Sequence, residues 1–360
     1  MKKKLVRYFL LRNRNKKIDI KKIDKILFIA YDAIGDMIMT TPVFRELKKI
    51  YPEKKIGVLC SERNKDVLKY NPYVDKIFIK NSKKWYFKDL RILKKIRDEK
   101  YDICINLWNK ISMTEMSFIK LLNVKYRASG VFQKNSENKY NILTEDIKMY
   151  DYIFGDRKEK HFSKQQISSL EVFGIKTDNL KYDIFISEKE KEKAKKFFKE
   201  FSGKIKIFIN MFSSEEKRNI KFEDVCFIVE KVKEKYKNAI FFLNSIPEKR
   251  VELIEKIKKS NFENIKIMYE TESILDAVAG IEYADLLITP DTSFTHIAEA
   301  LDKPMIVIYS GVLKNYEKVK TFSKKHYAIF SDNKDENIIE KYDKNKIIEK
   351  LELILDEEKI

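Results

Sequence analysis

The chain has 360 residues, of which 44% are hydrophobic, and it carries a formal net charge of +19. This length and composition exclude a disordered chain and allow two domains with sizeable cores. Cys60, Cys104 and Cys226 are far apart in apolar runs, which argues against a disulfide framework. With no apolar run near the roughly 20 residues that cross a bilayer, and no signal-peptide core, a cytoplasmic protein is expected.

Residues 1–24 form a basic N-terminal extension. Between residues 1 and 22, basic side chains face a single acid, Asp19, and flank an apolar cluster from Leu5 to Leu11. Such a segment can lie on an anionic membrane surface, where each charge adds about 1 kcal/mol. The alternative is a solvated tail. From the residues alone, a peripheral contact with the inner face of the cytoplasmic membrane and a solvated tail both stay open.

An N-terminal domain is predicted over residues 25–175, because strand-like and helix-like segments alternate there. The expected helices are 64–70, 88–98, 114–122 and 161–173. The expected strands are 26–30, 55–60, 74–79, 101–107 and 124–129. This alternation is typical of a doubly wound parallel sheet.

A second alternating series predicts a C-terminal domain over residues 184–345, after a linker at 174–183. Helices are expected at 188–201, 222–235, 248–259 and 273–283, and strands at 205–210, 239–243, 265–268, 286–288 and 305–309. The sequence thus predicts an α/β fold with two Rossmann-like halves. None of the eight glycines forms G-x-G-x-x-G, which argues against a dinucleotide enzyme, and there is no Walker A motif.

The stretch 286–311 reads as strand, sharp turn, short helix and second strand. Its turn carries Asp291, Thr292 and Ser293, and hydroxyl side chains of this kind cap helix N-termini. Such a unit directs a helix N-terminus, with free N–H donors and a partial positive charge, towards the carboxyl edge of the sheet. Phosphate groups bind at such positions, although purely structural caps use the same residues.

A second strand-turn-helix unit lies at residues 25–47. It contains Gly35-Asp36 followed by Thr41-Pro42, and the C-terminal unit pairs its Asp-Thr-Ser turn with His296. Together these two ordered motifs resemble glycosyltransferase family 9, the heptosyltransferases of lipopolysaccharide core synthesis. The resemblance covers residues 25 to about 312.

The resemblance implies a GT-B architecture, with two Rossmann-like domains facing a central cleft. The N-terminal domain would bind the acceptor and the C-terminal domain the nucleotide-sugar donor. The implied reaction is inverting transfer of a sugar, by default heptose from ADP-heptose, to a glycolipid acceptor of the lipopolysaccharide or lipooligosaccharide core. No cofactor is implied. Metal independence also fits, because the sequence has no Asp-x-Asp and its three histidines are scattered.

Asp36 matches the family's proposed catalytic aspartate and is the candidate general base; its alternative role is a helix cap. Lys217 resembles the lysine that reaches the donor phosphates. The usual Trp-Pro after it is replaced by Asn219-Ile220, so the neighbouring Arg218 is an equal candidate. A solvated surface loop is the alternative for both cations.

Five further donor-binding candidates come from the C-terminal half. Thr292 and Ser293 would supply neutral donors to the diphosphate, and Asp291 would orient the site or bind sugar hydroxyls. His296 is expected to face the phosphate or the sugar, and the alternative is a histidine with a purely structural role. Glu248 matches an acid that contacts the nucleoside, although the glycine usually before it is missing.

Two other classes of function remain open at this point. A GT-B-like nucleotide-sugar epimerase would share the phosphate site without a lipid acceptor. A nucleic-acid-binding protein would explain the net charge. The basic residues are interspersed with 56 acidic ones and no stacking motif is present, so no nucleic-acid partner is expected.

Overall fold

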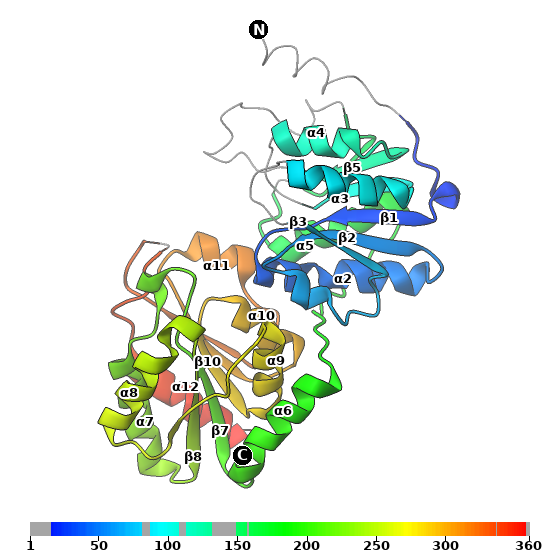
Figure 1. The fold of residues 1–360 in the computed structure, drawn as a ribbon. Coiled ribbons are helices and arrows are strands. Elements are labelled where there is room, and N and C mark those ends of the chain that lie inside the picture. The colour runs from blue at the N-terminus through cyan, green and yellow to red at the C-terminus, as the bar shows by residue number, and fades with distance from the viewer. Residues whose placement is uncertain are drawn as a thin grey trace. The chain divides into compact units, whose positions relative to one another are not determined.

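The computed structural model describes residues 16–80, 87–107, 113–131, 149–156, 158–335 and 337–357 (Figure 1). Most of the basic extension, residues 1–15, lies outside the described residues. The chain forms two compact units, an N-terminal unit (Met1–Lys181) and a C-terminal unit (Tyr182–Ile360). Their boundary falls inside the segment 174–183 that was expected to be the linker.

The N-terminal unit contains a six-stranded sheet in the order β3-β2-β1-β4-β5-β6, and every pair is parallel. Its strands are β1 (Lys25–Ile29), β2 (Lys55–Ser61), β3 (Lys76–Lys80), β4 (Ile103–Asn106), β5 (Tyr126–Gly130) and β6 (Tyr152–Phe154). Its α-helices are α2 (Ile34–Ile50), α3 (Phe87–Asp98), α4 (Met113–Leu121) and α5 (Phe162–Ile167).

Helices cover both faces of this sheet, which is why its central strands are apolar at successive positions. On one face, Phe44 of α2 meets the ring of Phe28 edge-on, with ring centroids 5.4 Å apart. On the other face, Ile96 of α3 and Ile119 of α4 belong to the same buried cluster as Leu27 of β1.

The C-terminal unit repeats this topology in the order β12-β11-β10-β7-β8-β9, again with all pairs parallel. Its strands are β7 (Ile205–Asn210), β8 (Ala239–Asn244), β9 (Ile265–Ile267), β10 (Leu286–Pro290), β11 (Met305–Tyr309) and β12 (His326–Phe330). Its α-helices are α6 (Glu188–Phe198), α7 (Phe222–Lys235), α8 (Arg250–Ser260), α9 (Ile274–Tyr283), α10 (Ser293–Ala300), α11 (Leu313–Val319) and α12 (Lys344–Glu357).

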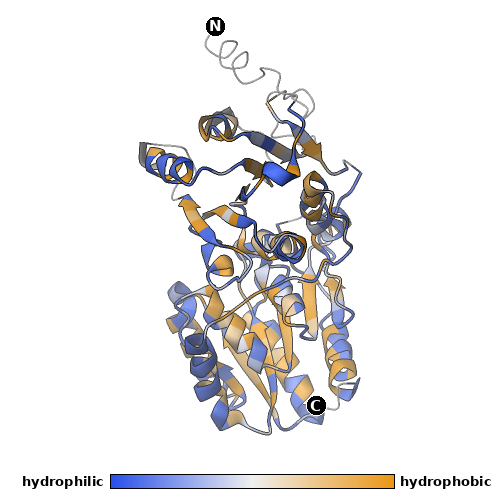
Figure 2. Ribbon diagram, turned by 90° about the vertical axis from the view of Figure 1, so that its right-hand side faces the viewer, coloured by the Kyte–Doolittle hydropathy of each residue, from blue (hydrophilic) through white to orange (hydrophobic). Residues whose placement is uncertain are grey.

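The two faces of the second sheet are covered by different sets of side chains. Ile207 of β7 packs in one cluster with α7 and α12, whereas the next residue, Phe208, faces Phe294 of α10. Figure 2 shows the hydrophobic colour concentrated on the strands of this unit, with hydrophilic residues on the outer sides of the helices. The α/β fold with two Rossmann-like halves is confirmed.

Several expected elements have different bounds in the structure. The helix expected at 64–70 is wrong, because only a 3-10 turn (Lys65–Leu68) forms there. β6, β12 and α12 were not anticipated, and β6 is only three residues long. The strand expected at 286–288 runs two residues further, and Pro290, which pairs with Ile308, is its last residue. Proline is tolerated at a strand end because its missing N–H is not needed there.

Both sheets reverse their strand order at one point, between β1 and β4 and between β7 and β10. In open α/β sheets, ligands bind outside the carboxyl ends of the strands at this switch point. The loops after these four strands are therefore the places to look for a site. Across the described ranges, no helix is long and apolar enough to traverse a bilayer.

Candidate active site

The switch point of the C-terminal unit is organised by Asn210, the last residue of β7. Its side chain is 1% exposed, and Nδ2 lies 3.0 Å from the Phe212 carbonyl oxygen and 3.0 Å from Thr289 Oγ1. Thr292 Oγ1 is 3.3 Å from the same nitrogen. One buried amide thus joins the loop after β7 to the loop after β10.

The helix that leaves this switch point, α10, begins with a hydroxyl cap. Thr292 is its N-cap, and Oγ1 accepts a hydrogen bond from the Phe294 N–H at 3.3 Å. Ser293 is the first helical residue and is half-buried. No acidic residue lies in the first turn, so the helix itself carries no carboxylate that offsets the partial positive charge of its N-terminus.

Arg218 lies beside this turn and pairs with Asp291. Its terminal NH2 group is 3.0 Å from Asp291 Oδ2, and the two side chains are 18% and 21% exposed. The same group donates to the Asp291 carbonyl oxygen. Burial raises the pKa of the Asp291 carboxyl, while the guanidinium opposes that rise. Arg218 Nε is buried and has no hydrogen-bond partner within the described residues.

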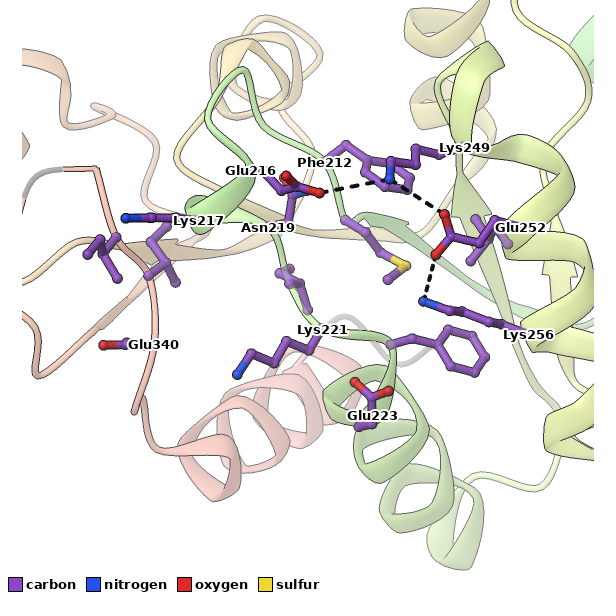
Figure 3. A pocket seen from close by; sticks show the side chains of 16 residues that line it. Phe212, Glu216, Lys217, Asn219, Lys221, Glu223, Lys249, Glu252, Lys256 and Glu340 are labelled. Carbon is purple, nitrogen blue, oxygen red and sulfur yellow. Dashed lines mark ion pairs between the residues drawn. The ribbon is translucent and has the colours of Figure 1, made fainter.

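Lys217 points elsewhere. It is exposed and lines a cavity of about 540 Å³ formed by the loop 211–223, the start of α8 and residues 338–340. Figure 3 shows Lys217 and Glu340 on one side of this cavity and Lys249, Glu252 and Lys256 on the other.

On the side of this cavity opposite Lys217, acidic and basic side chains form ion pairs with one another. Lys249 is 3.8 Å from a Glu216 oxygen and 3.5 Å from Glu252, which also pairs with Lys256 at 2.9 Å. Because carboxylates alternate with ammonium groups here, this wall offers no net positive field to an anion. The structure therefore separates the two candidate cations, with Arg218 at the switch point and Lys217 at this cavity.

The remaining candidates of the C-terminal unit differ in exposure. His296 is only 4% exposed, and its ring meets that of Tyr182 edge-on at 5.9 Å between centroids. Glu248 is exposed on a 3-10 turn (Pro247–Lys249) that precedes α8. Asp291, Thr292, Ser293 and Arg218 are thus gathered at one turn, while His296 is packed inside and Glu248 follows a different strand.

In the N-terminal unit, Asp36 is the third residue of α2, directly after the switch-point strand β1. It is half-buried, and Oδ2 accepts a hydrogen bond from the Ala33 N–H at 3.0 Å. The Asp36 carbonyl oxygen accepts from Thr40 Oγ1 at 2.7 Å. Asp36 is therefore not the N-cap residue, which is Ala33, but its carboxylate does cap the first turn by accepting the Ala33 N–H. A cap of this kind also fixes the carboxylate at the carboxyl edge of the sheet.

The Thr41-Pro42 pair has a clear local explanation. Pro42 lies inside α2 and has no N–H to donate to the carbonyl oxygen of Ile38, four residues earlier. Thr41 Oγ1 donates to that same oxygen at 2.7 Å. The hydroxyl therefore replaces the missing backbone hydrogen bond, and the helix continues to Ile50.

Two side chains at these edges were missed in the sequence. Asn64 was expected to begin a helix and Asn210 to end a strand, and neither was given a role of its own, yet each has its amide buried between two segments of its unit. An asparagine at the end of a buried strand or in the short loop after one was the available signal. Among the residues described, no group of three or more His, Cys, Asp or Glu side chains could hold a metal ion.

Comparisons with known proteins agree with the motifs. The sequence model "Glycosyltransferase family 9 (heptosyltransferase)" matches residues 90–348. Lipopolysaccharide heptosyltransferase 1 of Campylobacter coli is 23% identical over 303 residues, covering 82% of this chain and 87% of that protein.

Two solved structures share the fold over nearly the whole chain. The family 9 glycosyltransferase from Veillonella parvula DSM 2008 is 18% identical, with a TM-score of 0.76, over 93% of this chain and 97% of that one. E. coli heptosyltransferase WaaC, solved with ADP, is 13% identical, with a TM-score of 0.71, over 92% and 99%. The family match spans most of the sequence, and the chain therefore belongs to glycosyltransferase family 9 and is a glycosyltransferase.

Proposed function

We propose that the chain transfers heptose from ADP-heptose to a glycolipid acceptor of the lipopolysaccharide or lipooligosaccharide core. The observation that carries the donor half is the convergence of Arg218, Asp291 and the N-terminus of α10 at the second switch point. A helix N-terminus beside a guanidinium is suited to a diphosphate. The ADP bound by the E. coli relative supports the choice of nucleotide.

Arg218 is the cation that we assign to the leaving diphosphate. It is partly buried and fixed by Asp291, and its Nε donor has no partner in the described part of the chain. Lys217 is exposed and would have to turn away from its cavity. Thr292 and Ser293 add hydroxyl and backbone donors at the same turn.

Asp36 is the proposed general base. Its carboxylate takes the proton of the acceptor hydroxyl while that oxygen attacks the anomeric carbon of the donor sugar. The bond from this carbon to the diphosphate oxygen breaks, and the configuration inverts. The negative charge that develops on the departing ADP is stabilised by Arg218 and the α10 N-terminus, so the scheme requires no metal ion.

Family membership favours glycosyl transfer over the nucleotide-sugar epimerase and nucleic-acid-binding alternatives. Incubation of the donor without an acceptor distinguishes the epimerase, because an epimerase would release an isomerised sugar nucleotide. The peripheral membrane contact stays a proposal as well. Deletion of residues 1–22 should release the protein from anionic liposomes, and unchanged binding would contradict it.

The donor assignment is tested by thermal unfolding with ADP, UDP, GDP and CMP, without added divalent metal. A ligand that binds only the native state raises its stability by mass action. We expect a selective shift with ADP. A selective shift with UDP or GDP would mean that the donor sugar is carried by that nucleotide instead of ADP. The absence of any shift would contradict the proposed phosphate site. An ADP-selective shift justifies assays of ADP-heptose with lipid acceptors.

A further inference from the structure

Asn64 lies in the loop after β2 and is 1% exposed. Its Nδ2 donates to the carbonyl oxygens of Ala30 at 3.2 Å and Asp32 at 3.1 Å. Its Oδ1 accepts from the backbone N–H of Ser61 at 2.9 Å and from Ser61 Oγ at 3.0 Å. The side chain therefore connects the loop after β2 to the turn that follows β1.

An asparagine amide has two N–H donors and one oxygen that accepts two hydrogen bonds, so this side chain is fully satisfied. Position 64 requires both the two N–H donors and the accepting oxygen. A carboxylate would place an oxygen against two carbonyl oxygens, and an apolar side chain would leave both carbonyl groups and the Ser61 donors without this partner. Asparagine at position 64 is thus matched to the backbone that surrounds it.

The turn held by Asn64 leads directly to Asp36. Ala30 continues the pairing of β1 with β2 through its N–H, which donates to the Leu59 carbonyl oxygen at 3.0 Å. Three residues later, the Ala33 N–H donates to Asp36 Oδ2 at 3.0 Å. The residue that contacts the Asp36 carboxylate therefore belongs to the same turn whose two carbonyl groups Asn64 binds.

We propose that Asn64 is a positioning residue for sugar transfer, acting through the turn 30–33 on the carboxylate of Asp36. This inference rests on the proposed function, in which Asp36 removes the acceptor proton. A base that is displaced by about 1 Å can lose on the order of 100-fold in rate.

The test is Asn64→Asp, which keeps the size and the acceptor of the side chain and removes both donors. We expect kcat to fall about 10- to 100-fold while KM for the sugar nucleotide changes less than about twofold. Hydrogen exchange at the amides of residues 30–37 should become faster. This second readout reports the turn itself and does not depend on activity.

Asn71→Asp is the matched control. Asn71 lies in the same unit, is 4% exposed and accepts the Tyr73 N–H at 2.9 Å, but its Nδ2 has no hydrogen-bond partner among the residues that the structure describes. The same chemical change there should leave kcat and exchange at residues 30–37 within about twofold of the wild type. A general effect of a buried aspartate on the N-terminal unit would instead appear in both variants.

Folded Asn64→Asp with wild-type kcat and wild-type exchange would overturn the inference. If that variant does not fold, Ser61→Ala takes its place, since it removes only the hydroxyl donor to Asn64 Oδ1. Smaller changes in the same two readouts are expected, and their absence would also overturn it. If the wild type transfers no sugar from any nucleotide, the proposed function fails, while the exchange data still decide whether Asn64 orders the turn.

Discussion

The two switch points of the molecule have the same topology but carry different charged groups. At the first, the helix after β1 carries Asp36 in its opening turn, and this carboxylate accepts a backbone N–H of its own turn. At the second, the helix after β10 is capped by the neutral Thr292, and Arg218 lies beside it. One edge thus presents a carboxylate held by its own turn, and the other presents the Arg218–Asp291 ion pair beside a helix whose first turn has no acidic residue.

This difference shows that strand order alone does not determine the chemistry of such an edge. In each sheet, a helix N-terminus lies at the carboxyl edge beside the switch point. A few residues of the turn then decide whether this edge carries a carboxylate or a site that can bind an anion. A glycosyltransferase needs both, a base for the acceptor and a positive site for the diphosphate. The two units would therefore contribute complementary groups to one reaction.

The largest expected effect is at the acidic edge. Asp36→Asn keeps the side-chain size but removes the proton acceptor, so turnover should fall about 100- to 10,000-fold. The measurement is kcat with ADP-heptose and a core acceptor, together with a thermal unfolding curve. Near-normal turnover would exclude Asp36 as the base.

Asp102 provides the matched control for this substitution. Its carboxylate also accepts backbone N–H bonds, from Asp24 and Lys25 at 2.9 Å, but at the amino end of β1. If Asp36 served only as a cap, Asp36→Asn and Asp102→Asn would both lower stability and spare kcat. Loss of kcat in Asp36→Asn alone would separate catalysis from capping.

At the basic edge, Arg218→Ala should weaken ADP binding about 10- to 100-fold, because hydrogen bonds to charged groups contribute about 1.5–3 kcal/mol. Lys217→Ala should change the affinity less than about threefold. Isothermal titration calorimetry with both variants measures this contrast. The reverse order of effects would assign the diphosphate to Lys217 and its cavity.

Arg218→Ala also leaves Asp291 without its partner, so part of any loss could come from a disturbed turn. Asp291→Asn combined with Arg218→Ala removes the unpaired carboxylate. If the double variant recovers ADP affinity, Arg218 acts mainly by neutralising Asp291. If it does not, the guanidinium itself contacts the nucleotide.

Most of the fold could be predicted from the sequence, because parallel strands buried on both faces appear as short apolar runs. The strands at 205–210 and 305–309 and the helix at 222–235 are confirmed in full. β12 could not be read in the same way, since it is only partly buried and its sequence, HYAIF, lacks a clear period. The prediction of a helix at 64–70 was wrong. The side chain of Asn64 binds backbone groups about 30 residues away in the sequence, and hydrophobic periodicity carries no sign of such a contact.

The candidate site could be predicted only where a motif marked it. Asp36 and the Asp291 turn follow strands in recognisable order, and the structure places both at switch points. The choice between Lys217 and Arg218 depends on which side of one 3-10 turn each residue faces, and adjacent residues cannot be ranked by spacing. His296 was expected to face a ligand, but its 4% exposure depends on Tyr182, which is more than a hundred residues away in sequence.

A smaller effect concerns a buried carboxyl group of the N-terminal unit. Glu115 on α4 is 3% exposed, and burial raises its pKa from 4.5 to about 9. As pH rises from about 4.5 towards 9, the unfolded chain loses this proton before the native state does, so the native state loses stability. Glu115→Gln removes this pH-dependent loss of stability. Between pH 5 and 9, the free energy of unfolding of the variant should rise by more than about 1 kcal/mol relative to that of the wild type.

Thermal or urea unfolding across this range checks the prediction. Glu53→Gln, at a side chain that is 65% exposed in the same unit, is the control and should show a constant difference from the wild type. A constant difference for Glu115→Gln as well would mean that Glu115 is ionised in the native state. That result would place a buried negative charge on α4, in the same unit as Asp36.

The smallest effect concerns the cap of α10, and it separates structure from binding. Thr292→Val and Ser273→Ala each remove a hydroxyl that accepts a first-turn N–H, at 3.3 Å in α10 and 3.2 Å in α9. Each should lower the free energy of unfolding by about 1 kcal/mol. Only Thr292→Val should also reduce the thermal shift produced by ADP, because α9 begins away from the switch point. Equal ADP shifts in the two variants would mean that the Thr292 hydroxyl serves the helix alone, and the neutral donors to the diphosphate would then have to be backbone N–H groups.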